Sequence, residues 1–423
     1  MTLAVLHIGK YFPPHRGGME NYLADLMAAQ QRRGLPPAAL VHGSRPALRD
    51  REETVTHGGQ ALRVRRAAVW LTLFFAPLAP LFAASAARLI RRQRPALLHL
   101  HLPNVSAFWL LLLPAARRLP WIVHWHADVV ASPHSRALRL LYPLLYRPLE
   151  QALLRRAAAV IATSPPYLRS SEPLAAHRER CHVIPLGLDP RRLGSDGPAP
   201  NGPDADRGGD PRTAVDADPG GMAISGDDSA RAHHAANAAA PLRVVAVGRL
   251  TYYKGLEYLV DAAAQCPAVR VTLVGEGERA PALRRQIAAA GIADRVRLAG
   301  ALDDADLAAA LRGADLLCLP SIERTEAFGM VLLEAMALGV PVLATRVPGT
   351  GMAWIVQSSG AGRLVDPGDA AALAGALREL AADRATLRTL GARGQAAFSE
   401  RFHIERGSAA IAALYRASAA SAR

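Results

Sequence analysis

Two glutamates eight residues apart have the surroundings of a site that binds sugars and phosphates. Glu326 lies in a polar loop after the apolar run 316–319, and Glu334 follows inside a helical pattern that begins near Phe328. A helix that begins at the carboxyl end of a parallel strand offers free backbone N–H groups to an anionic ligand. The neighbours of Glu334 are nearly all apolar, so we expect this carboxylate to be partly buried and to need a partner such as a ligand hydroxyl.

Two cations form a second candidate group. Arg249 and Lys254 occupy the glycine-bearing loop that follows the apolar strand 242–247. They could converge on a diphosphate and neutralise it without a metal. The alternative is a pair of solvated surface cations. Because Lys10 and Lys254 are the only lysines in the chain, compositional drift explains a lysine at this position poorly.

The first half of the chain contributes glycines and histidines. Gly17 and Gly18 follow the apolar strand 3–8, where a backbone without Cβ lets a phosphate or sugar come close, although such a pair alone more often marks only a turn. His124 and His126 lie on one side of the strand 121–125. We expect His124 to be a structural core residue and His126, at the strand tip, to contact a ligand. We find no compelling third metal ligand, so we expect no metal site.

The stretch 326–342 resembles the E-x7-E signature of the retaining, GT-B-fold glycosyltransferases of family 4. The match includes Glu326-Ala327-Phe328-Gly329 and the segment from Glu334 to Val342. The resemblance implies that Glu326 holds the hydroxyls of the donor sugar, that Glu334 holds the ribose hydroxyls, and that His126 touches the transferred sugar. It also implies a diphosphate held by Arg249 and Lys254, with Gly17 and Gly18 facing it across the cleft.

The remaining implied contacts surround the same ligand. The resemblance assigns backbone N–H groups to the sugar and phosphate at Phe328, Gly329 and Met330, and it assigns the wall of the base pocket to Gly275 and Glu276. No Asp-x-Asp motif of the metal-dependent type stands at a strand end, since Asp204-Ala205-Asp206 lies in a segment without core-forming residues. We therefore expect no metal and no other cofactor beyond the donor.

Strands and helices alternate along both halves of the chain, which predicts an α/β protein with doubly wound sheets. The resemblance implies the GT-B form of this class, in which two Rossmann-like domains face each other across a cleft. We predict an acceptor-binding domain at 1–190 and a nucleotide-sugar-binding domain at 242–400. We also predict a helix at 401–423 that returns to the first domain. Residues 191–241 are predicted to be an interdomain linker, disordered because the run from 195 lacks aromatic residues and is rich in Gly, Pro, Asp and Ala.

One stretch, 70–90, has the length of a membrane-spanning helix. It contains Pro77 and Pro80 and carries arginines on both sides, so we favour a loop and an amphipathic helix that could rest on a membrane surface. The stretch 104–113 is predicted to be a buried helix, and 370–398 one long helical stretch.

The positive charge of the chain is concentrated in its first half. Residues 1–194 hold 26 Lys and Arg against 10 Asp and Glu. An anionic membrane, a pyrophosphate-linked lipid or nucleic acid would suit this excess, and so would the arginine usage of a GC-rich genome. No nucleic-acid motif is found. Three cysteines without metal spacing and the lack of a signal peptide favour a cytoplasmic protein, at the inner face of the inner membrane if it meets lipid.

The leading hypothesis is transfer of a hexose from a nucleotide sugar to a lipid-linked or polysaccharide acceptor. Segments around 124–128, 162–165, 183–189 and 320–321 resemble bacterial mannosyl- and rhamnosyltransferases of surface-polysaccharide assembly, which favours a GDP-linked donor over a UDP-linked one. Alternatives are a UDP-sugar enzyme, a phosphorylase or sucrose-type synthase of the same fold, and a non-catalytic membrane-associated scaffold. A pyridoxal-phosphate phosphorylase would need a Schiff-base lysine, which neither Lys10 nor Lys254 is placed to provide.

Overall fold

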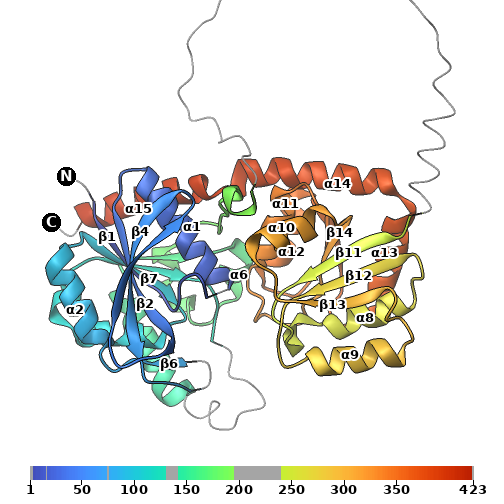
Figure 1. The fold of residues 1–423 in the computed structure, drawn as a ribbon. Coiled ribbons are helices and arrows are strands. Elements are labelled where there is room, and N and C mark those ends of the chain that lie inside the picture. Colours follow the sequence, from blue (N-terminus) through green and yellow to red (C-terminus); the bar gives the residue numbers. More distant parts are fainter. Residues whose placement is uncertain (1–2, 16, 74–75, 130–141, 195–239, 422–423) are drawn as a thin grey trace, which may run out of the picture.

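Two largely parallel β-sheets, each flanked by helices, lie side by side in the computed structural model (Figure 1). The structure describes residues 3–15, 17–73, 76–129, 142–194 and 240–421. Of the predicted linker, 191–241, residues 195–239 lie outside the described residues, whereas its first four residues are described and continue the 3₁₀ segment η4 Pro190–Leu193. Runs of Val, Leu, Ile and Ala form the central strands because a parallel sheet covered on both faces needs apolar side chains on both.

The first sheet has eight strands in the order β10-β9-β8-β7-β1-β2-β4-β3, and only β3 runs antiparallel to its neighbour. The strands are β1 Val5–Ile8, β2 Pro37–Pro46, β3 Arg51–His57, β4 Gln60–Val69, β7 Leu97–Leu102, β8 Trp121–Trp125, β9 Ala159–Ala162 and β10 Cys181–Val183. Its helices are α1 Gly18–Arg32, α2 Phe82–Gln93, α3 Pro114–Arg117, α5 Arg147–Arg156 and α6 Pro165–Ser170. Strand β3 was not predicted: six of its seven residues are polar or charged, and none of them is fully buried.

The candidate membrane segment folds as a small hairpin, β5 Leu71–Leu73 with β6 Ala76–Leu78, followed by α2. No helix among the described residues is long and apolar enough to cross a membrane. The predicted buried helix at 104–113 is wrong in part. It is a 3₁₀ segment, η1 Val105–Leu112, which buries Ala107 and Leu110 but exposes Trp109 and Leu112.

The second sheet has six parallel strands in the order β13-β12-β11-β14-β15-β16. They are β11 Leu242–Val247, β12 Val269–Val274, β13 Val296–Gly300, β14 Leu316–Leu319, β15 Val342–Thr345 and β16 Gly362–Val365. The helices are α8 Leu256–Ala264, α9 Ala280–Ala289, α10 Asp304–Arg312, α11 Met330–Ala337, α12 Gly351–Ser359, α13 Ala370–Ala382, α14 Arg384–Ala397 and α15 Ile404–Ala420. The predicted helical stretch 370–398 is divided at Asp383, whose carboxylate caps α14 by accepting from the backbone N–H of Thr386.

The last helix, α15, lies against α1 of the first sheet's domain (Figure 1). Gln30 on α1 donates to the hydroxyl of Tyr415 over 2.9 Å. Arg32 forms ion pairs with Glu405 and with Asp189. A continuous apolar core that includes Tyr22, Leu333 and Tyr415 joins the two domains.

Candidate active site

A cavity of about 770 Å³ lies between the two domains, where the loops after β1 and β8 face those after β11, β12 and β14. All twelve candidate residues named from the sequence line it, namely Gly17, Gly18, His126, Arg249, Lys254, Gly275, Glu276, Glu326, Phe328, Gly329, Met330 and Glu334. Folding therefore brings together residues that are up to 317 positions apart in the sequence, counted from Gly17 to Glu334. Their individual roles stay predictions.

Lys254 and Glu326 form a close ion pair in this cavity, with 2.5 Å between Nζ and Oε2. Burial by itself would lower the pKa of Lys254, but the charge of Glu326, the charge of Tyr253 and the hydrogen bond to Glu326 together outweigh it, and the pKa is raised. The ammonium therefore stays charged although the side chain is nearly enclosed. An incoming diphosphate would find a cation already positioned, with Glu326 beside it to meet a hydroxyl.

A third cation near the cavity was missed from the sequence. Lys10 follows β1 in the first domain and its pKa is lowered, mainly by burial and further by the charge of Arg249, while Glu20 acts in the opposite direction. Lys10 and Arg249 thus act on each other across the cleft. Two features of the sequence could have identified Lys10 as a site residue: its position after the first strand and the rarity of lysine in this chain.

Glycines let the backbone walls of the cavity meet. Gly275 has φ +132°, and a Cβ there would lie 2.0 Å from the carbonyl oxygen of Gly248. Gly18 faces Met330 of the other domain, where a Cβ would stand 3.2 Å from Cγ. Gly329 has φ +82° and is the N-cap residue of α11, so it has no side chain that could accept a hydrogen bond from the first N–H groups of the helix. The N–H of Leu332 donates to the Gly329 carbonyl oxygen, so the N–H groups of Met330 and Val331 are the ones that α11 offers to an anionic ligand.

Glu334 already has a partner within the protein, and this partner was not predicted from the sequence. Nη2 of Arg192, in the short 3₁₀ segment η4 Pro190–Leu193, lies 2.8 Å from Oε1 of Glu334. Both side chains are almost fully buried. The expectation that a ligand hydroxyl would be the partner of this carboxylate is thus incomplete. No spacing rule connects two residues 142 positions apart.

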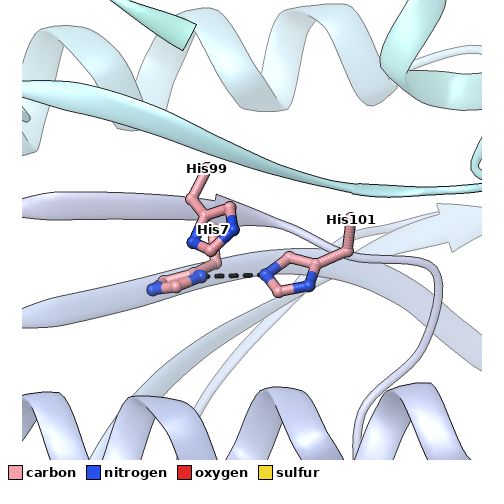
Figure 2. A group of neighbouring side chains, drawn as sticks. All are labelled: His7, His99 and His101. Carbon is pink, nitrogen blue, oxygen red and sulfur yellow. Dashed lines mark hydrogen bonds between the residues drawn. The ribbon is translucent and has the colours of Figure 1, made fainter. Parts of the chain in front are cut away.

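Five histidines from three adjacent strands are buried together on one face of the first sheet. They are His7 on β1, His99 and His101 on β7, His124 on β8, and His126 just after it. Figure 2 shows three of them, with the hydrogen bond of 3.1 Å between His7 and His101. His101 is in turn hydrogen-bonded to His126, with 3.0 Å between their ring nitrogens. On its other side, Nε2 of His7 is hydrogen-bonded to the side-chain oxygen Oε1 of Gln30 over 2.8 Å.

The cluster has enough ring nitrogens close together to consider a metal ion. Those of His7, His99 and His101, and those of His101, His124 and His126, lie within 4.8 Å of one another. Four of the rings, however, are stacked, namely those of His99, His101, His124 and His126, with 4.4 Å between the centroids of His124 and His126 and only 8° between their planes. The ring of His7 is tilted by 40° to that of His99 and by 31° to that of His101. Because a nitrogen lone pair lies in its ring plane, stacked rings do not aim at one point. The arrangement suits neutral, hydrogen-bonded imidazoles better than a shared ion.

Burial sets the protonation of these rings. It lowers the pKa of His7 to about 4 and that of His126 to about 3. The pKa values of His99, His101 and His124 are also well below the ordinary range, with burial as the main cause and neighbouring histidines adding to it. The alternating patterns His-Leu-His and His-Trp-His on two strands were signals that the sequence reading used only for His124 and His126.

Two facing Rossmann-like domains with a ligand-sized cleft at the carboxyl ends of their strands define the GT-B class of protein. Comparisons with known proteins agree. Residues 17–187 match the family "Glycosyl transferase 4-like domain", and residues 231–397 match "Glycosyl transferases group 1". The chain therefore belongs to the group 1, family 4 glycosyltransferases, as the E-x7-E stretch predicted, and the predicted GT-B fold is confirmed.

Similar proteins are found over the full length of the chain. It is 28% identical to the O-antigen chain mannosyltransferase C of Escherichia coli over 95% of this chain and 94% of that one. It is 29% identical to the D-rhamnosyltransferase WbpZ of Pseudomonas aeruginosa over 62% and 58% of the two chains. Among solved structures, sucrose-phosphate synthase from Thermosynechococcus elongatus aligns with a TM-score of 0.74 at 24% identity, covering 99% of this chain and all of that one.

Proposed function

We propose that this chain is a retaining glycosyltransferase that moves a mannose- or rhamnose-like hexose from a GDP-sugar to a lipid-linked or growing polysaccharide acceptor. The observation that carries the proposal is the Lys254–Glu326 pair beside the uncapped start of α11 in the interdomain cavity. Cations and N–H groups would hold the diphosphate, and Glu326 and His126 the sugar. The mannosyl- and rhamnosyltransferase relatives support the choice of sugar.

The proposed reaction needs no metal. Lys254, Arg249 and Lys10 supply positive charge from both sides of the cavity, and these residues would take over the neutralisation of the leaving diphosphate. Glu334 would hold the ribose hydroxyls, and Gly275 and Glu276 would line the base. The alternative is an enzyme that uses a UDP-sugar. It would differ from the proposed one only in the base that binds against Gly275 and Glu276.

Nucleotide binding tests the proposal directly. Thermal unfolding is measured with GDP, UDP, ADP and dTDP in the presence of EDTA. A ligand at a hundred times its Kd adds about 2.7 kcal/mol to the free energy of unfolding, so GDP should raise Tm by several degrees and the other nucleotides less. A larger shift with UDP would favour the alternative donor. If none of the four shifts Tm, the chain is a scaffold and the proposed function fails.

The acceptor side offers an apolar surface next to the cavity. Trp70, Leu71 and Leu78 of the β5–β6 hairpin region are exposed, as are Trp109 and Leu112 on η1, which contacts β6. The side chain of Thr72 in the hairpin hydrogen-bonds Tyr11, in the loop that carries Pro14 and His15 to the cavity wall. We propose that this surface rests on the cytoplasmic face of an anionic membrane and receives a lipid-linked acceptor there.

Vesicle binding provides the measurement for this surface. The double variant Trp70→Ser, Leu112→Ser should bind vesicles of phosphatidylcholine and phosphatidylglycerol at least about ten-fold more weakly than the unmodified chain, because each large apolar side chain contributes about 1.5–3 kcal/mol when buried. Val183→Ser, on the edge strand β10 and outside the apolar surface, is the matched control and should bind normally. Equal sedimentation of all three proteins with vesicles would show that the apolar surface does not meet lipid.

A further inference from the structure

One guanidinium group, that of Arg192, lies among three carboxylates from both domains. Its Nη2 is 2.8 Å from Oε1 of Glu334 on α11, its Nη1 is 3.6 Å from Asp304 at the start of α10, and its Nε is 3.8 Å from Asp25 on α1. The Arg192 side chain is only 4% exposed, and that of Asp25 is fully buried. Glu334 and Asp304 line the cavity, whereas Arg192 stands behind them.

The burial of this arginine makes its partners energetically important. Burial by itself would lower the pKa of Arg192, but the charges of Glu334 and Asp25 raise it, so the side chain stays ionised. Of its nitrogens, only Nη2 has a hydrogen-bond partner among the described residues. A buried ion pair that loses one partner leaves a costly, uncompensated charge. Arg192 and Glu334 therefore compensate each other's charge in a buried place.

The contact also restricts the carboxylate. Only Oε1 of Glu334 receives the arginine, so the second oxygen keeps its acceptor capacity for a donor in the cavity. A ribose hydroxyl is such a donor under the proposed function. Without Arg192, a carboxylate on the apolar helix α11 would turn toward solvent and would lose its acceptor geometry.

We propose that Arg192 is the positioning residue for ribose recognition: it holds Glu334 oriented toward the cavity, and through Asp25 it ties that carboxylate to the first domain. The inference rests on the proposed function, because it assigns the nucleotide ribose to Glu334. It adds a residue outside the E-x7-E stretch, supplied by the segment that joins the two domains. Ribose binding and the contact between domains then share one ion pair.

Discrimination between GDP and 2′-deoxyGDP tests this role. Affinities are measured by calorimetry for the unmodified chain, Arg192→Met, Arg192→Lys and Arg191→Met. The unmodified chain should prefer GDP by about ten-fold or more, as expected for a hydroxyl bound to a charged acceptor. Arg192→Met should lose most of this preference and keep its affinity for 2′-deoxyGDP within about three-fold, since a hydrogen bond that is never formed cannot be lost. Arg192→Lys should recover part of the preference.

The controls separate the possible failures. Arg191 pairs with Asp189 and is 39% exposed, so Arg191→Met should retain the preference of the unmodified chain. If Arg192→Met does not fold, Arg192→Gln, which keeps an N–H donor without charge, should show the reduced ratio. An unchanged ratio in the folded Met or Gln variant overturns the role of Arg192. If the unmodified chain binds neither GDP nor UDP, the proposed function itself fails.

Discussion

Replacing Lys254 with methionine is expected to lower the rate of donor hydrolysis and transfer by about two to three orders of magnitude. The ammonium group is enclosed and held 2.5 Å from Glu326, so it is positioned before the ligand arrives and loses little by reorganising. Its removal takes away charge stabilisation of the leaving diphosphate and leaves the Glu326 carboxylate to repel that anion. Single-turnover release of nucleoside diphosphate from a GDP-hexose measures the effect.

A second substitution distinguishes charge stabilisation from loss of structure. The double variant Lys254→Met, Glu326→Gln no longer has an unpaired carboxylate, so it should recover GDP binding toward that of the unmodified chain while turnover stays low. Arg270→Met, an exposed position on β12, serves as the control and should turn over normally. Full activity in the Lys254→Met variant would remove this lysine from the catalytic site.

A fall in pH from 7 toward 4 is expected to destabilise the protein steeply. The buried histidines have folded pKa values far below the ordinary 6.5, for example about 4 for His7 and about 3 for His126. Below pH 6.5 the unfolded chain therefore takes up protons that the folded chain does not. Their contribution to stability is complete above pH 6.5 and is lost as the pH falls toward the folded values, by up to about 1.4 kcal/mol per histidine and pH unit.

The histidine stack can be tested one ring at a time. Neither ring nitrogen of His124 has a hydrogen-bond partner in the part of the chain that the structure describes. His124→Phe should therefore be tolerated at pH 7 and should flatten the fall of the denaturation midpoint between pH 6.5 and 4. His182→Phe, at an exposed position on β10, should leave that slope unchanged. If the slope is the same in all three proteins, the stack is not the source of the acid sensitivity.

Local patterns in the sequence were sufficient for the elements that carry the site. The apolar periodicity after Phe328 predicted α11, and Gly339 with Pro341 predicted its end and the strand that follows. The same reasoning predicted the strands whose carboxyl ends line the cavity, because a run of apolar residues bounded by turn residues depends on neighbours in the sequence. The E-x7-E stretch identified the family, since its residues lie within one loop and one helix.

Contacts between distant segments were decided only by the tertiary structure. The pairing of Arg192 with Glu334, the assembly of five histidines and the position of Lys10 opposite Arg249 depend on strand order and domain packing. A buried charge or imidazole interacts with whichever partner the fold brings near it. The periodicity of the sequence does not predict that partner. The sequence by itself thus determined most of the elements, the family and the residues at the strand ends. The tertiary structure determined the partners, because burial and electrostatics act through space and not along the chain.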